Sequence, residues 1–196
     1  MEKPIGGLAE LWNSRDVALI IMLAVTGFVY TALVFQLGFL VSGIPGSNYL
    51  FVIGQAIWNS IAYLLFEGKR WRLVFTITLF GLLTMPTSAM GTPFNILPRI
   101  PLILNGLQLD IIMNTVYPFF KRKNKLMWAA IIFSLENFII DGILRIATYP
   151  VFYSIEYAST FIGIFFMMLP IIIIESVAGG YLGFKIYHKI SNRRPD

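Results

Sequence analysis

The side chains that could do chemistry in this sequence are acids and amides set within long apolar stretches. The segment 102–120 carries a group of five polar residues, Asn105, Gln108, Asp110, Asn114 and Thr115. In a helix, Asp110 and Asn114 lie on one side because they are four residues apart, whereas Gln108 lies on another side. More than one face of this helix is polar, which predicts a central position in a bundle.

A second apolar stretch, 126–148, has its polar residues along a single stripe. These residues recur at intervals of three and four and are Ser134, Asn137, Asp141, Arg145 and Thr148, whereas Glu136 lies off the stripe. Asp141 and Arg145 are one helical turn apart. That spacing fits an intrahelical ion pair and fits equally a charged ligand clamp near the end of the helix, so both interpretations stay open.

The third candidate acid is Glu175, which stands alone in the apolar run 160–187. Small residues follow it, and Gly179 and Gly183 have the small-xxx-small spacing that lets two helix backbones approach closely. We therefore predict close helix packing at these two glycines.

An ionisable side chain near the centre of a bilayer costs roughly 2.5 to 3.5 kcal/mol, so these groups need partners or a function. Acids outnumber bases among them. If they converge on one cavity, that cavity favours a cationic or strongly hydrogen-bonding solute, on which aromatic rings can stack. The candidate ligand-binding residues are Asp110, Asn114, Asn137, Asp141, Arg145, Glu175, Trp58, Tyr149 and Tyr153.

The elements that must position these residues are transmembrane helices. The chain is 57% hydrophobic and only 13% charged, against about 25% charged in an ordinary soluble domain. We predict an all-α integral membrane protein with one domain over 1–196. Apolar spans of the length that crosses a bilayer are predicted at about 17–41, 49–66, 73–85, 102–120, 126–148 and 160–187. Prolines between 86 and 101 argue against a continuous helix there, and 149–159 is predicted as an aromatic loop.

Orientation follows from the basic residues, because short loops rich in lysine and arginine stay in the cytoplasm. Basic clusters follow the second, fourth and sixth spans, at 69–72, 121–125 and 185–194. We therefore expect a multi-pass protein of the cell membrane with both termini in the cytoplasm. The net charge of +5 is interpreted as this topology signal and not as a nucleic-acid surface.

Residue types that are missing or rare exclude several chemistries. There is no cysteine, and the single histidine, His188, lies in the basic C-terminal tail. These facts argue against Ser-His and Cys-His hydrolases. No phosphate-binding glycine loop is present. We expect no enzymatic activity, no cofactor and no metal, and we expect any ATP hydrolysis to reside in partner subunits.

The pattern resembles the substrate-binding S component of an energy-coupling factor transporter, over nearly the whole chain. In thiamine-type members, short motifs with polar residues mark helices four, five and six. Asp110 matches the first motif, Asn137 or Asp141 ahead of Gly142 matches the second, and Glu175 ahead of 176–179 matches the third.

This resemblance implies capture of a vitamin-like solute from outside, such as a thiamine-like or pyrimidine-type compound. The loops 42–48 and 149–159 would close over it. It also implies partners, namely a transmembrane coupling subunit and two ATPases. The family commonly has an Ala-x-x-x-Ala patch on helix one for docking, which is absent here, and Gly27 with Thr31 is the nearest substitute.

Two other functions fit the same residues. A stand-alone proton- or cation-coupled transporter or channel would use the buried carboxylates as a relay. A membrane enzyme acting on lipid-like substrates would use Asp110, Asp141 or Glu175 as acid, base or metal ligand, although no metal-ligand cluster of the usual spacing is visible.

Overall fold

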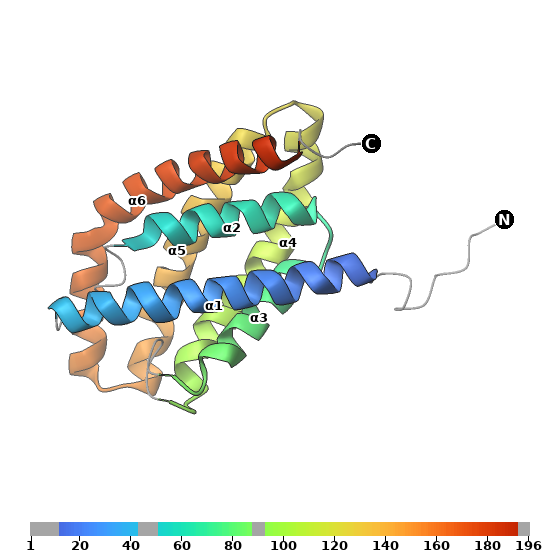
Figure 1. The fold of residues 1–196 in the computed structure, drawn as a ribbon. Coiled ribbons are helices and arrows are strands. Elements are labelled where there is room, and N and C mark those ends of the chain that lie inside the picture. Colours follow the sequence, from blue (N-terminus) through green and yellow to red (C-terminus); the bar gives the residue numbers. More distant parts are fainter. Residues whose placement is uncertain (1–11, 43–50, 88–92, 192–196) are drawn as a thin grey trace.

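The computed structural model describes residues 12–42, 51–87 and 93–191, and these fold almost entirely into helices (Figure 1). The elements are α1 (Ser14–Ser42), α2 (Val52–Phe66), α3 (Arg72–Thr84), the short 3₁₀ helix η3 (Leu97–Arg99), α4 (Ile100–Arg122), α5 (Leu126–Phe152) and α6 (Ile155–Ser191). The predicted all-α bundle of six helices is confirmed for these residues. The expected loop 42–48 lies, apart from Ser42, outside the described residues.

Three helices are long and apolar enough to cross a membrane, over Ser14–Val34, Leu126–Phe152 and Ile155–Ser191. The two shorter helices differ from full spans, since α2 has 15 residues and α3 has 13. At 1.5 Å per residue they reach only about 20 Å, whereas the hydrocarbon core is about 30 Å thick. Three helices therefore support membrane association. The two short helices need neighbouring helices to supply hydrogen-bond partners for the backbone groups at their ends.

The helices are neighbours in the order α1, α3, α4, α5, α6 and α2, and contacts between α2 and α1 close the ring. α2 also contacts α5 and so reaches the centre of the bundle. Inside, the ring of Tyr63 on α2 stacks on Phe133 of α5, with 4.4 Å between ring centroids. Successive helices run in alternating directions, so the C-terminal ends of α2, α4 and α6 lie at the same end of the bundle. We call this the basic end, since it holds Lys69, Lys121 and Lys185, and we call the opposite end the aromatic end.

Close contacts of α6 depend on glycine, as the sequence predicted. A Cβ atom on Gly179 would lie 2.4 Å from the Cβ of Ala56 and 2.8 Å from the carbonyl oxygen of Ile53 on α2. A Cβ atom on Gly180 would lie 2.7 Å from the Cα of Ile131 on α5. α6 therefore packs against two helix backbones at once. Figure 1 shows that α6 also changes direction along its length, and Pro170 lies within it.

The connection between α5 and α6 differs from the expected aromatic loop 149–159. α5 continues to Phe152 and α6 begins at Ile155, so only Tyr153 and Ser154 lie between them. Ser154 begins the new helix, because its hydroxyl accepts the Tyr157 N–H at 3.2 Å and its carbonyl accepts the Ala158 N–H at 3.0 Å. Tyr149 and Tyr157 are consequently helical and held in fixed positions.

We expect Gly179→Ala and Gly180→Ala to lower the free energy of unfolding by about 1 to 3 kcal/mol, because the added methyl group overlaps backbone atoms. The matched control is Gly163→Ala in the same helix, where an added Cβ has no neighbour within 4 Å. The measurement is unfolding of the purified protein by SDS titration. Equal losses in all three variants would contradict the packing described here.

Candidate functional site

The residues that the sequence singled out as ligand-binding do not converge on one cavity. They lie in three places: at the basic end, in the middle of the bundle and at the aromatic end. The structure brings together Asp141, Arg145, Tyr149 and Tyr153 at the aromatic end, and it brings together Asp110 and Asn114 at the basic end. The other candidates bind atoms of neighbouring helices, and each place has its own role.

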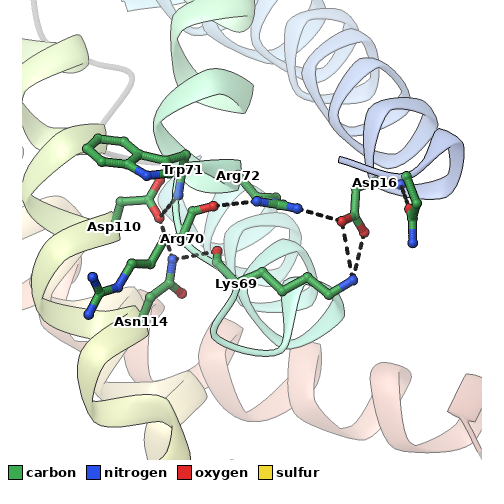
Figure 2. A network of polar contacts seen from close by, with 8 residues as sticks. Asp16, Lys69, Arg70, Trp71, Arg72, Asp110 and Asn114 are labelled. Atoms are coloured by element: carbon green, nitrogen blue, oxygen red, sulfur yellow. Dashed lines mark hydrogen bonds and ion pairs between the residues drawn. The ribbon is translucent and has the colours of Figure 1, made fainter. Parts of the chain in front are cut away.

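At the basic end, Asp110 holds the beginning of α3 (Figure 2). Its carboxylate accepts the backbone N–H groups of Trp71 at 2.8 Å and Val74 at 2.7 Å. Asn114, one turn further along α4, donates to this carboxylate and to the carbonyl oxygen of Lys69 at 3.1 Å. α3 has no capping side chain of its own. A carboxylate from α4 therefore satisfies its first N–H groups, where negative charge is favourable.

On the other side of the same turn, Asp16 of α1 binds two basic residues (Figure 2). Its carboxylate lies 2.9 Å from the Lys69 ammonium and 2.9 Å from the Arg72 guanidinium. The Arg72 side chain is 6% exposed, and its guanidinium also lies 4.4 Å from the ring centroid of Trp12. Sequence reasoning missed Asp16 as an internal partner, although an acid at the start of an apolar span was a visible signal.

In the middle of the bundle, amide and acid side chains pair between α4 and α5. Asn105 donates to the side-chain oxygen of Asn137 at 2.9 Å and to its carbonyl oxygen at 3.0 Å. Gln108 donates to the carboxylate of Glu136. Within the described part of the chain, three buried oxygens of this region have no hydrogen-bond partner. They are the side-chain amide oxygens of Asn105 and Gln108 and the hydroxyl oxygen of Ser134. We call these five residues the polar seam.

Glu175 is placed at the beginning of α2, where its carboxylate accepts the N–H of Ile53 at 3.0 Å. α2, like α3, lacks a capping side chain of its own. Glu175 therefore accepts a backbone N–H at the beginning of α2, as Asp110 does at the beginning of α3.

Trp58, another residue proposed from the sequence, lies between α1 and α2. Its indole N–H donates to the Thr26 hydroxyl at 3.0 Å, and its ring fills the space beside Gly27. Thr31 is fully buried. Gly27 and Thr31, which the sequence offered as a substitute docking patch, therefore face the interior of the bundle.

At the aromatic end, Arg145 makes three hydrogen bonds to side chains of α5. The Arg145 guanidinium binds the Asp141 carboxylate at 2.7 and 3.2 Å and donates to the Tyr149 hydroxyl at 2.7 Å. The ion pair between Asp141 and Arg145, one of the two interpretations left open by the sequence, is thus present. Arg145 is only 8% exposed, and a two-point contact of this kind fixes the orientation of the guanidinium.

Four rings contact one another at this end of α5. They belong to Tyr149, Tyr153, Tyr157 and Phe161, and we call them the aromatic cluster. The Tyr149 ring centroid lies 5.0 Å from that of Tyr153, 5.9 Å from that of Tyr157 and 4.7 Å from that of Phe161. Burial raises the pKa of Tyr153 to about 12, so its hydroxyl stays protonated at neutral pH. The cluster therefore consists of rings that pack on one another and includes a neutral phenol at Tyr153.

Arg99 lies at the same end, just before α4. It is fully buried and donates to the carbonyl oxygens of Thr84 at 2.9 Å, Thr87 at 3.4 Å and Asn95. It thereby fastens the end of α3 to the beginning of α4, which is a structural role that the sequence did not reveal.

An open hollow of about 320 Å³ lies beside the aromatic cluster, over the first two turns of α6. The residues that line it are Ser154, Glu156, Tyr157, Thr160 and Phe161. Tyr157 and Phe161 belong both to the hollow and to the aromatic cluster. The size is suitable for a small solute, and the lining offers a carboxylate, hydroxyls and ring faces.

No protein-family model matches the chain, and neither a curated protein nor a solved structure matches it. Over residues 12–42, 51–87 and 93–191, no group of three or more histidine, cysteine or acidic side chains could hold a metal ion. The arrangement at the aromatic end is suited to binding.

We expect Asp16→Asn to lower the free energy of unfolding by about 3 kcal/mol, because it removes a carboxylate from the buried Arg72 guanidinium. The matched control is Glu67→Gln, which breaks the exposed contact of Glu67 with Lys121 at 3.7 Å and should cost about 0 to 1 kcal/mol. SDS titration measures both changes. Similar losses in the two variants would show that Asp16 does not anchor the turn.

Proposed function

We propose that this chain is the membrane-embedded solute-binding subunit of an ATP-driven importer and captures a vitamin-like small molecule at its aromatic end. The observation that carries this proposal is the hollow of about 320 Å³ set against the aromatic cluster. Helices α5 and α6 hold the cluster on both sides, and the contact of Arg145 with Asp141 and Tyr149 orders it. A pre-ordered site of this kind loses little conformational entropy when a solute binds.

The topology expected from the basic loops supports the same proposal. With both termini in the cytoplasm, the aromatic end faces outside and the hollow is open to an external solute. The chain carries no nucleotide-binding motif, so an importer of this type would need a transmembrane coupling subunit and two ATPase subunits. Because Gly27 and Thr31 face inward, docking of the coupling subunit would use exposed apolar side chains of α1, such as Val25, Val29 and Leu33.

A second candidate function is a proton- or cation-coupled transporter or channel that acts alone. The polar seam favours it, because Glu136 and the unpartnered oxygens of Asn105, Gln108 and Ser134 lie at the interface of α4 and α5. Buried acids of this kind are common in proton relays. Against a long relay, Asp110 and Glu175 are bound to the backbone N–H groups of other helices.

We expect native mass spectrometry of the gently purified protein to show one retained molecule of vitamin size. Tyr157→Ala should abolish this mass, because it removes a ring that lines the hollow and contacts Tyr153. The matched control is Asp110→Asn at the basic end, which should destabilise the protein but leave the retained mass in the folded fraction.

The contrary result would be a protein that stays empty in several preparations and conducts protons or cations in liposomes without any ATPase. That outcome would replace solute capture by the second candidate function. Loss of the flux in Glu136→Gln would then place the conducting path at the polar seam.

A further inference from the structure

We infer that the hollow takes an organic cation, such as a quaternary ammonium group or a positively charged nitrogen heterocycle. This inference rests on the proposed function, since it names the chemical class of the solute bound at the same site. It follows from the layer of side chains that a solute meets first and from the placement of the two arginines behind that layer.

The first layer of the hollow carries negative charge and ring faces. Among the described residues that line it, Glu156 is the one charged side chain, and the two rings belong to Tyr157 and Phe161. Ser154 and Thr160 add hydroxyl groups, and none of these described residues is a lysine or an arginine. An anion placed here would meet the Glu156 carboxylate, whereas a cation is attracted both by that carboxylate and by the ring faces.

The aromatic cluster supports this preference because it sets further rings next to those that line the hollow. Tyr153 and Tyr157 have ring centroids 4.8 Å apart, and both contact the Tyr149 ring. Several adjoining aromatic rings are the usual arrangement for binding quaternary ammonium groups. Tyr153 contributes a neutral phenol, since burial keeps its pKa near 12.

The arginines at this end are bound by other groups of the protein. The Arg145 guanidinium is held by the Asp141 carboxylate at 2.7 Å and by the Tyr149 hydroxyl, and only 8% of the residue is exposed. Arg99 is fully buried and donates to backbone carbonyl oxygens between α3 and α4. A carboxylate or phosphate on the solute would have to displace these contacts before reaching either guanidinium.

The experiment compares three ligands of the same shape that differ in charge: choline, the neutral 3,3-dimethylbutan-1-ol and the anionic 3,3-dimethylbutyrate. Binding is measured by calorimetry in a maltoside detergent. We expect choline to bind about tenfold more tightly than the neutral isostere, in line with the strength of a cation–π contact in a partly desolvated site. The anionic isostere should not bind measurably.

Two variants and a control assign the effect to the hollow. Glu156→Gln and Tyr157→Leu should each reduce the preference for choline over the neutral isostere, whereas Glu67→Gln at the basic end should leave it unchanged. Equal binding of the three isosteres, tighter binding of the anion, or no response to Glu156→Gln would overturn the inference.

Two further comparisons separate the possible outcomes. If native mass spectrometry shows a retained neutral or anionic solute that Tyr157→Ala abolishes, the cation inference fails while solute capture stands. If no solute is retained and none of the isosteres binds, both fail.

Repeating the choline measurement in nanodiscs identifies the source of the cation. Loss of choline binding in phosphatidylcholine, but not in phosphatidylglycerol, would assign the hollow to a lipid headgroup. Equal binding in both lipids would assign it to a free solute. Either result supports recognition of an organic cation.

Discussion

Gly179, Gly180 and Gly183 allow α6 to touch the backbones of α2 and α5 at distances that no larger residue would permit. In lipid, apolar helices gain little from burying apolar surface against each other, so close backbone contact and hydrogen bonds must hold them together. The rest of the bundle depends on this contact. It brings Glu175 to the beginning of α2. The upstream part of α6, on which the hollow and half of the aromatic cluster lie, packs on α5, where the Phe165 ring fills the space beside Gly142.

Two acids within the bundle, Glu175 and Asp110, have the same structural role. α2 and α3 are short, begin without capping side chains of their own and would leave N–H groups unsatisfied away from water. Glu175 from α6 and Asp110 from α4 accept these N–H groups. The cost of placing a carboxylate in an apolar setting is thus offset by hydrogen bonds that a neutral side chain could not match in strength.

Most of the helix positions could be predicted from the sequence, because apolar length and basic loops depend only on local composition. Close packing at Gly179 and Gly183 could also be predicted from spacing within one helix, and the same kind of spacing made an Asp141–Arg145 pair one of two open interpretations. The partners of Asp110, Glu175 and Asp16 could not, because each binds an element distant in the chain. The prediction of an aromatic loop was wrong for a local reason, since Ser154 begins a helix where a series of aromatic residues suggested a loop.

The capping of α2 and α3 by later helices has a consequence for biosynthesis. The ribosome releases α2 and α3 before α4 and α6, so the first-turn N–H groups of the two short helices have no carboxylate partner when these helices are first synthesised. α3 acquires its partner when α4 emerges, whereas α2 must wait for α6, because Glu175 follows Ile53 by 122 residues. The beginning of α2 therefore completes its hydrogen bonds much later in synthesis than the beginning of α3, and α6 supplies the missing acceptor.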